Sequence, residues 1–262
     1  MFRKERIIDL MKLYSKTEIF EVIDDFIAKH EHPVVEILGP TGSGKTSFSV
    51  ELAKYLEDAE IISVDSRQVF LDIDISSAKV TEEEMQNVVH WGIDLLSPEG
   101  TFSVVDFQKY AFEKIDAIHK RGFIPILCGG TMLWLDAISE NYIFGENPDE
   151  KSTERGAPRF PVLKVGIELD REILYKRLND RAEAHFQYGL IEETQLLREK
   201  YKFSKSALTS FGYKEIMQYL DGETSKEEAL IANQKRNRNY AKRQMTWWRG
   251  REDVLWVDGE SL

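Results

Sequence analysis

The chain has 262 residues, enough for one large domain or for one domain with a small satellite. Its hydrophobic fraction of 42% can build a core, and its single cysteine excludes both an internal disulfide and a multi-cysteine metal site. The formal net charge of −11 at pH 7 excludes indiscriminate binding to nucleic acid, so any such contact needs a local basic surface.

The sequence shows no sign of membrane insertion or export. No stretch approaches the roughly 18 apolar residues of a membrane span. Asp9 and Lys12 interrupt any signal-peptide core near the N-terminus. We therefore expect a cytoplasmic protein without a membrane partner, and we take it to be a monomer.

The N-terminal residues 1–32 predict a helical extension. Apolar residues between 3 and 30 recur at helical spacing, which indicates two amphipathic helices with Ser15 or Thr17 as the cap between them. His32 and Pro33 end this segment.

Residues 33–140 alternate between strand and helix patterns and predict the core. The expected elements are a strand at 34–38, a helix to about 56, a strand at 61–64, an irregular stretch at 66–100, a helix at 104–119, a strand at 123–127 and a helix to about 140.

The second half of the chain begins with residues 141–161, whose prolines and glycines predict a short loop. Residues 162–262 predict a fourth core strand at 162–169 and then a mainly helical, basic C-terminal region. The alternation of strands and helices implies an α/β fold: a P-loop NTPase-like parallel sheet with helices on both faces.

The strongest motif is an eight-residue turn between the first strand of the core and its helix. It reads Gly39, Pro40, Thr41, Gly42, Ser43, Gly44, Lys45 and Thr46. Backbone N–H groups of such a turn, with the helix N-terminus, cradle phosphates, while the lysine adds charge and the threonine hydroxyl can bind Mg²⁺. The motif predicts a bound diphosphate or triphosphate but does not identify a reaction.

Two further features follow strands. Asp65 ends the second strand and has three interpretations: a Mg²⁺ ligand, a base for an incoming nucleophile, or a capping residue. Gly129, Gly130 and Thr131 follow the third strand, where open α/β sheets bind ligands, although a simple tight turn explains them equally well.

Basic residues form two groups in the second half. Arg177 and Arg181 lie four residues apart and could clamp a phosphate, but we favour a solvated face paired with Glu172 or Asp180. The stretch 233–251 holds seven Lys/Arg and no acid. With its aromatic residues it suits phosphate contact and base stacking, or is an ordinary solvated helix.

Taken in order, several blocks resemble those of the tRNA dimethylallyltransferases, also called tRNA isopentenyltransferases. The similar blocks are GPTGSGKT at 39–46, VDSRQVF at 64–70, DISSAK at 74–79, HWGIDLLSP at 90–98, TFSVVDF at 101–107, RGFIPILCGGT at 121–131, FGYKE at 211–215 and NYAKRQMTWWRG at 239–250. They fall in order over a stretch of about 210 residues, and the pairing of the Asp-Ser-Arg-Gln and Lys-Arg-Gln-x-Thr-Trp blocks is far more specific than the P-loop alone.

The resemblance implies a function: transfer of a dimethylallyl group from its diphosphate to the N6 amine of an adenine beside the tRNA anticodon, with Mg²⁺ as cofactor. The P-loop would hold the diphosphate and Thr46 the Mg²⁺, with Arg238 and Arg243 closing over the diphosphate. Asp65 would accept a hydrogen bond from N6.

The resemblance also implies an acceptor site. The residues expected there are Ser66, Arg67, Gln68 and Thr131, and we add Arg236 and Lys242 from the basic stretch. The family carries a helical insertion before the fourth strand, whereas here the short 141–161 stretch occupies that place. The chain therefore resembles a short form, and free AMP, ADP or ATP remains an alternative acceptor. A P-loop small-molecule or nucleotide kinase is a third interpretation.

Overall fold

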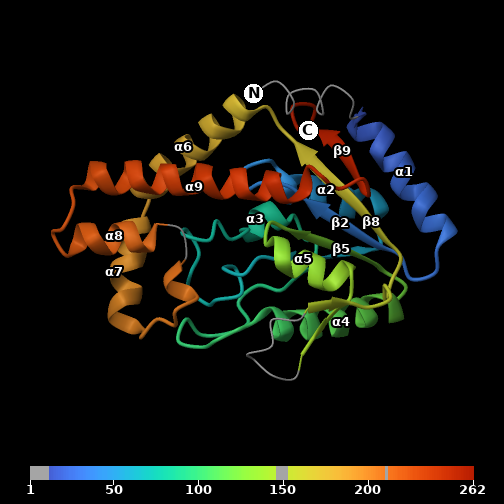
Figure 1. Cartoon of the computed structure of the whole chain (residues 1–262), viewed down its shortest axis with the longest axis horizontal. Helices are drawn as coiled ribbons and strands as arrows, with labels where there is room; N and C mark the ends of the chain where they lie inside the picture. Colours follow the sequence, from blue (N-terminus) through green and yellow to red (C-terminus); the bar gives the residue numbers. More distant parts are fainter. Residues whose placement is uncertain (1–11, 146–152, 210–211) are drawn as a thin grey trace.

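The computed structural model describes residues 12–145, 153–209 and 212–262. Its centre is a seven-stranded sheet of parallel strands in the order β1-β9-β8-β2-β5-β3-β4 (Figure 1). The strands are Leu13–Tyr14 (β1), Val34–Leu38 (β2), Ala59–Val64 (β3), His90–Trp91 (β4), Ile124–Gly129 (β5), Val162–Glu168 (β8) and Val254–Asp258 (β9).

Helices cover both faces of this sheet or lie beside it. They are Lys16–Lys29 (α1), Lys45–Leu56 (α2), Glu82–Met85 (α3), Val104–Lys120 (α4), Met132–Ser139 (α5), Arg171–Gln187 (α6), Leu190–Lys200 (α7), Tyr213–Leu220 (α8) and Lys226–Trp248 (α9). The predicted α/β, P-loop NTPase-like sheet with a helical C-terminal part is confirmed.

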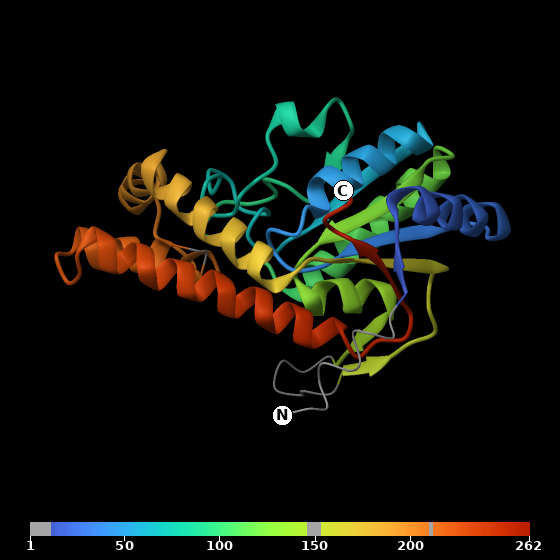
Figure 2. The ribbon, with the colours of Figure 1, turned by 90° about the horizontal axis from the view of Figure 1, so that it is seen from above.

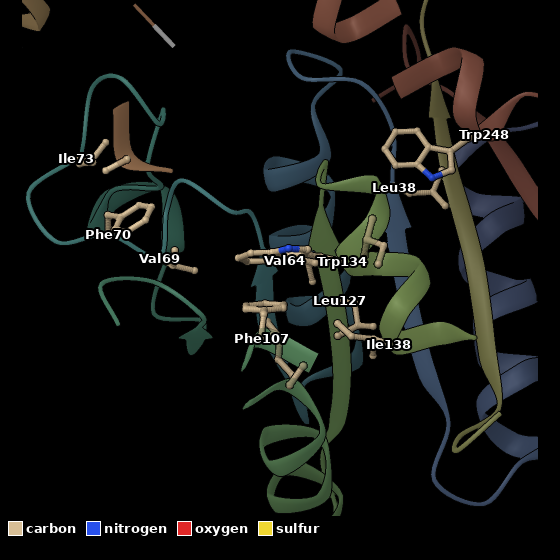
Figure 3. Packing of buried hydrophobic residues seen from close by; sticks show 14 of the residues in the cluster. Leu38, Val64, Val69, Phe70, Ile73, Phe107, Leu127, Trp134, Ile138 and Trp248 are labelled. Atoms are coloured by element: carbon tan, nitrogen blue, oxygen red, sulfur yellow. The ribbon is translucent and has the colours of Figure 1, made fainter. Parts of the chain in front are cut away.

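The central strand β2 shows why the sheet is covered on both sides. Successive side chains of a strand point to opposite faces. Val35 and Ile37 pack with α1 and α2, whereas Val34 and Leu38 belong to the larger core under α4 and α5. Figure 3 shows part of that core, where Phe107 of α4 stacks on Trp134 of α5 with ring centroids 4.4 Å apart.

The C-terminal helices form an arm beside the sheet. Helix α6 leaves the end of β8 and packs against the long helix α9, which returns to the sheet (Figures 1 and 2). Helices α7 and α8 lie at the outer end of this arm. The last residue of α9, Trp248, is fully buried in the main core, so the arm is anchored at both ends.

The segment around Ser15 agrees with the sequence only in part. Ser15 caps α1 in a capping box with Glu18, as predicted. The first helix of the proposed 1–32 extension falls largely on residues 1–11, outside the described residues. Leu13 and Tyr14, expected to be helical, instead form β1 and pair with β9. Their partner strand lies at the other end of the chain, so local periodicity could not report it.

Further elements were not predicted. Two stretches expected to be irregular contain regular structure: the 141–161 loop contains a hairpin of Tyr142–Phe144 (β6) and Thr153–Arg155 (β7), and 66–100 contains α3 and β4. Strand β9 follows the mainly helical region and was not predicted either. Among the described residues, no helix combines the length and hydropathy needed to cross a membrane.

The central strand also buries a charge. Glu36 is 1% exposed, and its carboxylate accepts a hydrogen bond from Ser139 of α5. Burial raises the pKa of Glu36 from 4.5 to about 7, although the hydrogen bond and the charge of Lys164 oppose this shift. A carboxyl group whose pKa is higher in the folded state opposes folding when it ionises. The penalty begins near pH 4.5 and is complete above pH 7.

We therefore expect Glu36→Gln to stabilise the protein at pH 8 relative to wild type, by up to roughly 3 kcal/mol, and to have little effect at pH 5. Urea unfolding at the two pH values measures this difference. Glu199→Gln, which changes an exposed carboxyl group on α7, is the matched control. If Glu36→Gln is instead less stable than wild type at pH 8, the negative charge of Glu36 stabilises the folded protein through Lys164.

Candidate active site

The P-loop joins the end of β2 to the start of α2 at the centre of the sheet. Gly42 and Gly44 have φ angles of 81° and 97°, a conformation that glycine adopts without strain. The turn places backbone N–H groups and the N-terminus of α2 around one point, which favours an anion there. The Oγ atom of Ser43 is buried and has no hydrogen-bond partner in the structure.

Lys45 begins α2 and folds back over the turn. Its Nζ donates to the carbonyl oxygen of Pro40 at 2.8 Å. Burial lowers the pKa of Lys45 to about 8, while the nearby charge of Asp65 acts in the opposite direction. The ammonium group is thus poorly solvated and available to an anion in the turn.

Asp65 follows β3 and lies, like the P-loop, at the edge of the sheet formed by the C-terminal ends of the parallel strands. Its Oδ1 accepts a hydrogen bond from the Arg67 backbone N–H at 2.8 Å, which fixes the turn after the strand. Only β5 separates β3 from β2, and neighbouring strands lie about 4.8 Å apart. Asp65 and the P-loop are therefore roughly 10 Å apart, across the end of β5.

The end of β5 requires glycine. A Cβ atom at Gly129 would lie 2.1 Å from the carbonyl oxygen of Val64, and one at Gly130 would lie 2.5 Å from Nε2 of Gln244. Both contacts are too short for any side chain. The sequence left these glycines undecided between a ligand contact and a turn. The structure shows close packing at both positions, and both glycines also line the cavity.

The residues next to Asp65 are held by mutual hydrogen bonds. Thr131 Oγ1 accepts from the backbone N–H of Ser66 at 3.0 Å. Arg67 donates to the carbonyl oxygen of Ser206 at 3.0 Å, and Gln68 donates to that of Ala78. The cavity is lined by Ser66, Arg67 and Gln68. Thr131 is not among the lining residues, and its hydrogen bond holds the backbone of Ser66 in position.

Helix α9 closes the site through a residue that the sequence analysis did not single out. Gln244 is fully buried; its Nε2 donates to the carbonyl oxygen of Gly130 at 2.8 Å, and its Oε1 accepts from the backbone N–H of Thr41 at 2.9 Å. Tyr240 donates to the same Gly130 oxygen at 3.1 Å. The signal was present, because Gln244 is the uncharged residue within the Lys-Arg-Gln block.

Helix α6 supplies a second guanidinium group. Arg181 Nη2 donates to Thr41 Oγ1 of the P-loop at 2.8 Å, and both Arg177 and Arg181 line the cavity. The favoured interpretation, a solvated face paired with Glu172 or Asp180, is therefore wrong for Arg181. Asp180 pairs instead with Lys176.

The other predicted basic residues of α9 have different positions. Arg243 lines the cavity, as does Arg236, whose Nη1 also donates to both oxygens of Glu215 at 3.2 Å. Arg238 is not among the lining residues; it donates to Asn179 of α6 and holds the two helices together. Lys242 is exposed outside the cavity lining, and its contact with RNA stays a prediction.

These groups enclose a cavity of about 860 Å³ between the sheet, α6 and α9. Its lining is cationic although the chain carries a net charge of −11. The cationic side chains are Lys45, Arg67, Lys79, Arg177, Arg181, Arg236 and Arg243, and the acidic ones are Asp65, Asp74 and Glu84. The cavity suits an anionic ligand at the P-loop with one carboxylate, Asp65, facing it.

A metal ion fits this site only together with such a ligand. Within the described ranges, no three His, Cys, Asp or Glu side chains are placed to hold a metal ion. Thr46 is exposed at the start of α2, and Asp65 faces the same cavity. One hydroxyl and one carboxylate are hard oxygen donors of the kind Mg²⁺ accepts when phosphates and water complete its shell.

Known proteins similar to this chain agree with one another. The sequence model of the family described as IPP transferase matches residues 68–157 and 144–251. The tRNA dimethylallyltransferase of Bacillus velezensis is 33% identical, with 87% of this chain and 91% of that protein covered. The protein of the same name from an Exiguobacterium species is 36% identical, with 86% and 90% covered.

A solved structure is similar as well. The full-length tRNA isopentenylpyrophosphate transferase from Bacillus halodurans has a TM-score of 0.80 and 33% identity, with 87% of this chain and 90% of that chain covered. The alignment with the B. velezensis protein spans 287 positions, more than this chain's 262 residues, so parts of that relative have no counterpart here. The two family matches overlap at residues 144–157, and the short loop in place of the insertion stays a prediction.

We expect Arg181→Ala to weaken the binding of inorganic diphosphate by about tenfold to a hundredfold, because a charge-assisted hydrogen bond next to the P-loop is lost. Isothermal titration calorimetry measures this affinity. Lys176→Ala, on the same helix but paired with Asp180 on its exposed side, should leave it unchanged. Equal affinities of Arg181→Ala and wild type would place the anion away from Arg181.

Proposed function

The chain belongs to the IPP transferase family, and from this we propose that it transfers a dimethylallyl group from dimethylallyl diphosphate to the N6 amine of an adenine in tRNA, adjacent to the anticodon. Diphosphate is the second product. The observation that carries the proposal is that the phosphate cradle and Asp65 open onto one cavity, about two strand spacings apart. That separation leaves room for the allylic chain between a diphosphate and an amine.

The P-loop end of the cavity is suited to the leaving group. Backbone N–H groups at the N-terminus of α2, with Lys45, Arg181 and Arg243, neutralise negative charge that increases on the diphosphate as the allylic C–O bond breaks. The electron pair of this bond leaves with the diphosphate. Mg²⁺, held by Thr46 and the diphosphate, would supply further charge neutralisation when bound.

The Asp65 end is suited to the acceptor. An aromatic amine is a weak nucleophile, and its N6 gains positive charge as the lone pair forms the new C–N bond. The Asp65 carboxylate accepts a hydrogen bond from N6 and takes the released proton. Ser66, Arg67 and Gln68 line the adjacent wall and orient the adenine, while Thr131 holds Ser66 in place.

A free adenine nucleotide is the second candidate acceptor. Its support is the net charge of −11 and the stretches of longer relatives that have no counterpart here, both of which weaken the case for a large RNA surface. In this alternative the chemistry at Asp65 and the P-loop is unchanged, and only the acceptor differs.

Product analysis by mass spectrometry tests the proposal. The purified protein is incubated with Mg²⁺ and dimethylallyl diphosphate, with unmodified tRNA and AMP offered in parallel. A mass gain on a tRNA adenine is the expected result. Gain on AMP alone would assign the free-nucleotide reaction, and gain on neither, with ATP turnover, would indicate a kinase.

We expect Asp65→Ala to lower kcat by about 10²- to 10⁴-fold, because the amine loses its proton acceptor. The affinity for inorganic diphosphate should change little, since the P-loop contacts remain. Asp74→Asn, which removes another carboxylate of the same cavity, is the control and should retain most activity. Rapid-quench assays of prenyl transfer measure the difference. Near wild-type turnover of Asp65→Ala would remove Asp65 from the mechanism.

A further inference from the structure

The outer end of α6 carries an aromatic ring that the fold does not bury. Tyr188 is 77% exposed, more than any other large hydrophobic side chain in the described ranges. Its backbone N–H donates to the carbonyl oxygen of Ala184 at 2.8 Å, so it closes the last turn of the helix. A ring with this exposure contributes little to the core, and tyrosine is enriched at contact surfaces.

The backbone around Tyr188 is fixed against the wall of the active site. Gly189 has a φ angle of 113° and turns the chain from α6 into α7. A Cβ atom at Gly189 would lie 3.2 Å from Cδ1 of Ile75, so this corner lies against the 74–78 segment. Glu193, one turn into α7, accepts hydrogen bonds from the backbone N–H groups of Asp74, Ile75 and Ser76. Tyr188 therefore projects from a rigid corner.

Helix α6 orders its side chains along the cavity. Arg177, Arg181, His185 and Tyr188 all line the cavity and follow one another at spacings of three or four residues, on one helix face. Arg181 touches the P-loop, and Tyr188 lies seven residues further on, about 10 Å along the helix. Burial lowers the pKa of His185 to about 4, so its ring is neutral at pH 7.

This row of side chains runs from Arg181, which contacts the P-loop where an anion would bind, to the exposed ring of Tyr188 at its other end. A chain with a net charge of −11 gains little from general attraction to a polyanion. Stacking on an aromatic ring attracts a base without requiring charge.

We propose that Tyr188 stacks on a base next to the reactive adenine and so selects RNA over a free nucleotide. The inference rests on the function proposed above. A free nucleotide has no neighbouring base, so Tyr188 contributes to the binding of an RNA acceptor only. Its ring acts on the acceptor's position and not on the bonds that break and form.

Steady-state kinetics with an RNA stem-loop and with AMP test this role. We expect Tyr188→Ala to raise the KM for the stem-loop between about fivefold and a hundredfold, as expected for one lost base–aromatic stack. The kcat and the KM for dimethylallyl diphosphate should not change. Tyr188→Phe and Tyr188→Trp should restore the RNA KM, and Tyr188→Leu should not. Ile231→Ala, an exposed apolar residue of α9 outside the cavity, is the control.

A spectroscopic measurement separates stacking from other effects. Stem-loops with 2-aminopurine on the 5′ or the 3′ side of the reactive adenine are titrated with protein. Stacking quenches the probe, so we expect quenching at one side with wild type and Tyr188→Phe, and its loss with Tyr188→Ala.

The outcomes distinguish the two proposals. A wild-type protein that modifies no RNA would overturn the proposed function and this inference together. A wild-type protein that modifies RNA, with an unchanged RNA KM and unchanged quenching in Tyr188→Ala, would overturn this inference alone. Unfolding curves of the variants should coincide with that of wild type, because the ring is exposed.

Discussion

The active site depends on the side-chain amide of one buried residue, Gln244. It accepts a hydrogen bond from the P-loop at Thr41 and donates one to the carbonyl oxygen of Gly130 at the end of β5. One amide therefore fixes α9 to the phosphate cradle and to the strand between the cradle and Asp65. A buried amide without these partners would cost about 1–3 kcal/mol, so the arrangement is strongly specified. The position of Arg243, one residue earlier on α9, follows from it.

The cavity also shows how an acidic protein binds anions. Net charge controls attraction at long range, but within about 10 Å the local arrangement dominates. The P-loop concentrates backbone dipoles and Lys45 at one point, and α6 and α9 bring guanidinium groups to it from two directions. Asp65 is one of three carboxylates among the cations of the lining, as the acceptor of positive charge must be a carboxylate. The cationic end and the acidic end of the cavity thus result from where individual residues are placed, and not from the overall composition of the chain.

The features that were predicted correctly from the sequence are those encoded by short, continuous stretches of residues. The P-loop, the strand before it and Asp65 lie in continuous blocks whose chemistry is legible residue by residue, and the parallel sheet followed from the alternation of elements. The failures concern pairings between distant segments. Strand β1 exists because β9 offers it a partner, and Arg181 reaches Thr41 only because α6 folds over the P-loop. A helix surface looks the same in sequence whether it faces solvent or a cavity, so Arg181 could not be separated from Lys176.

The two ends of the seven-stranded sheet are its shortest strands, β1 and β4, with two residues each. An unpaired strand edge is a template for another chain, and a long flat edge invites aggregation. Among the described residues, β1 pairs with Trp256 and Val257 of β9, and β4 pairs with Ile61 and Ile62 of β3, so each outer strand covers part of the longer strand beside it. Without residues 13–14, this side of β9 would lose its strand partner and become open to self-association.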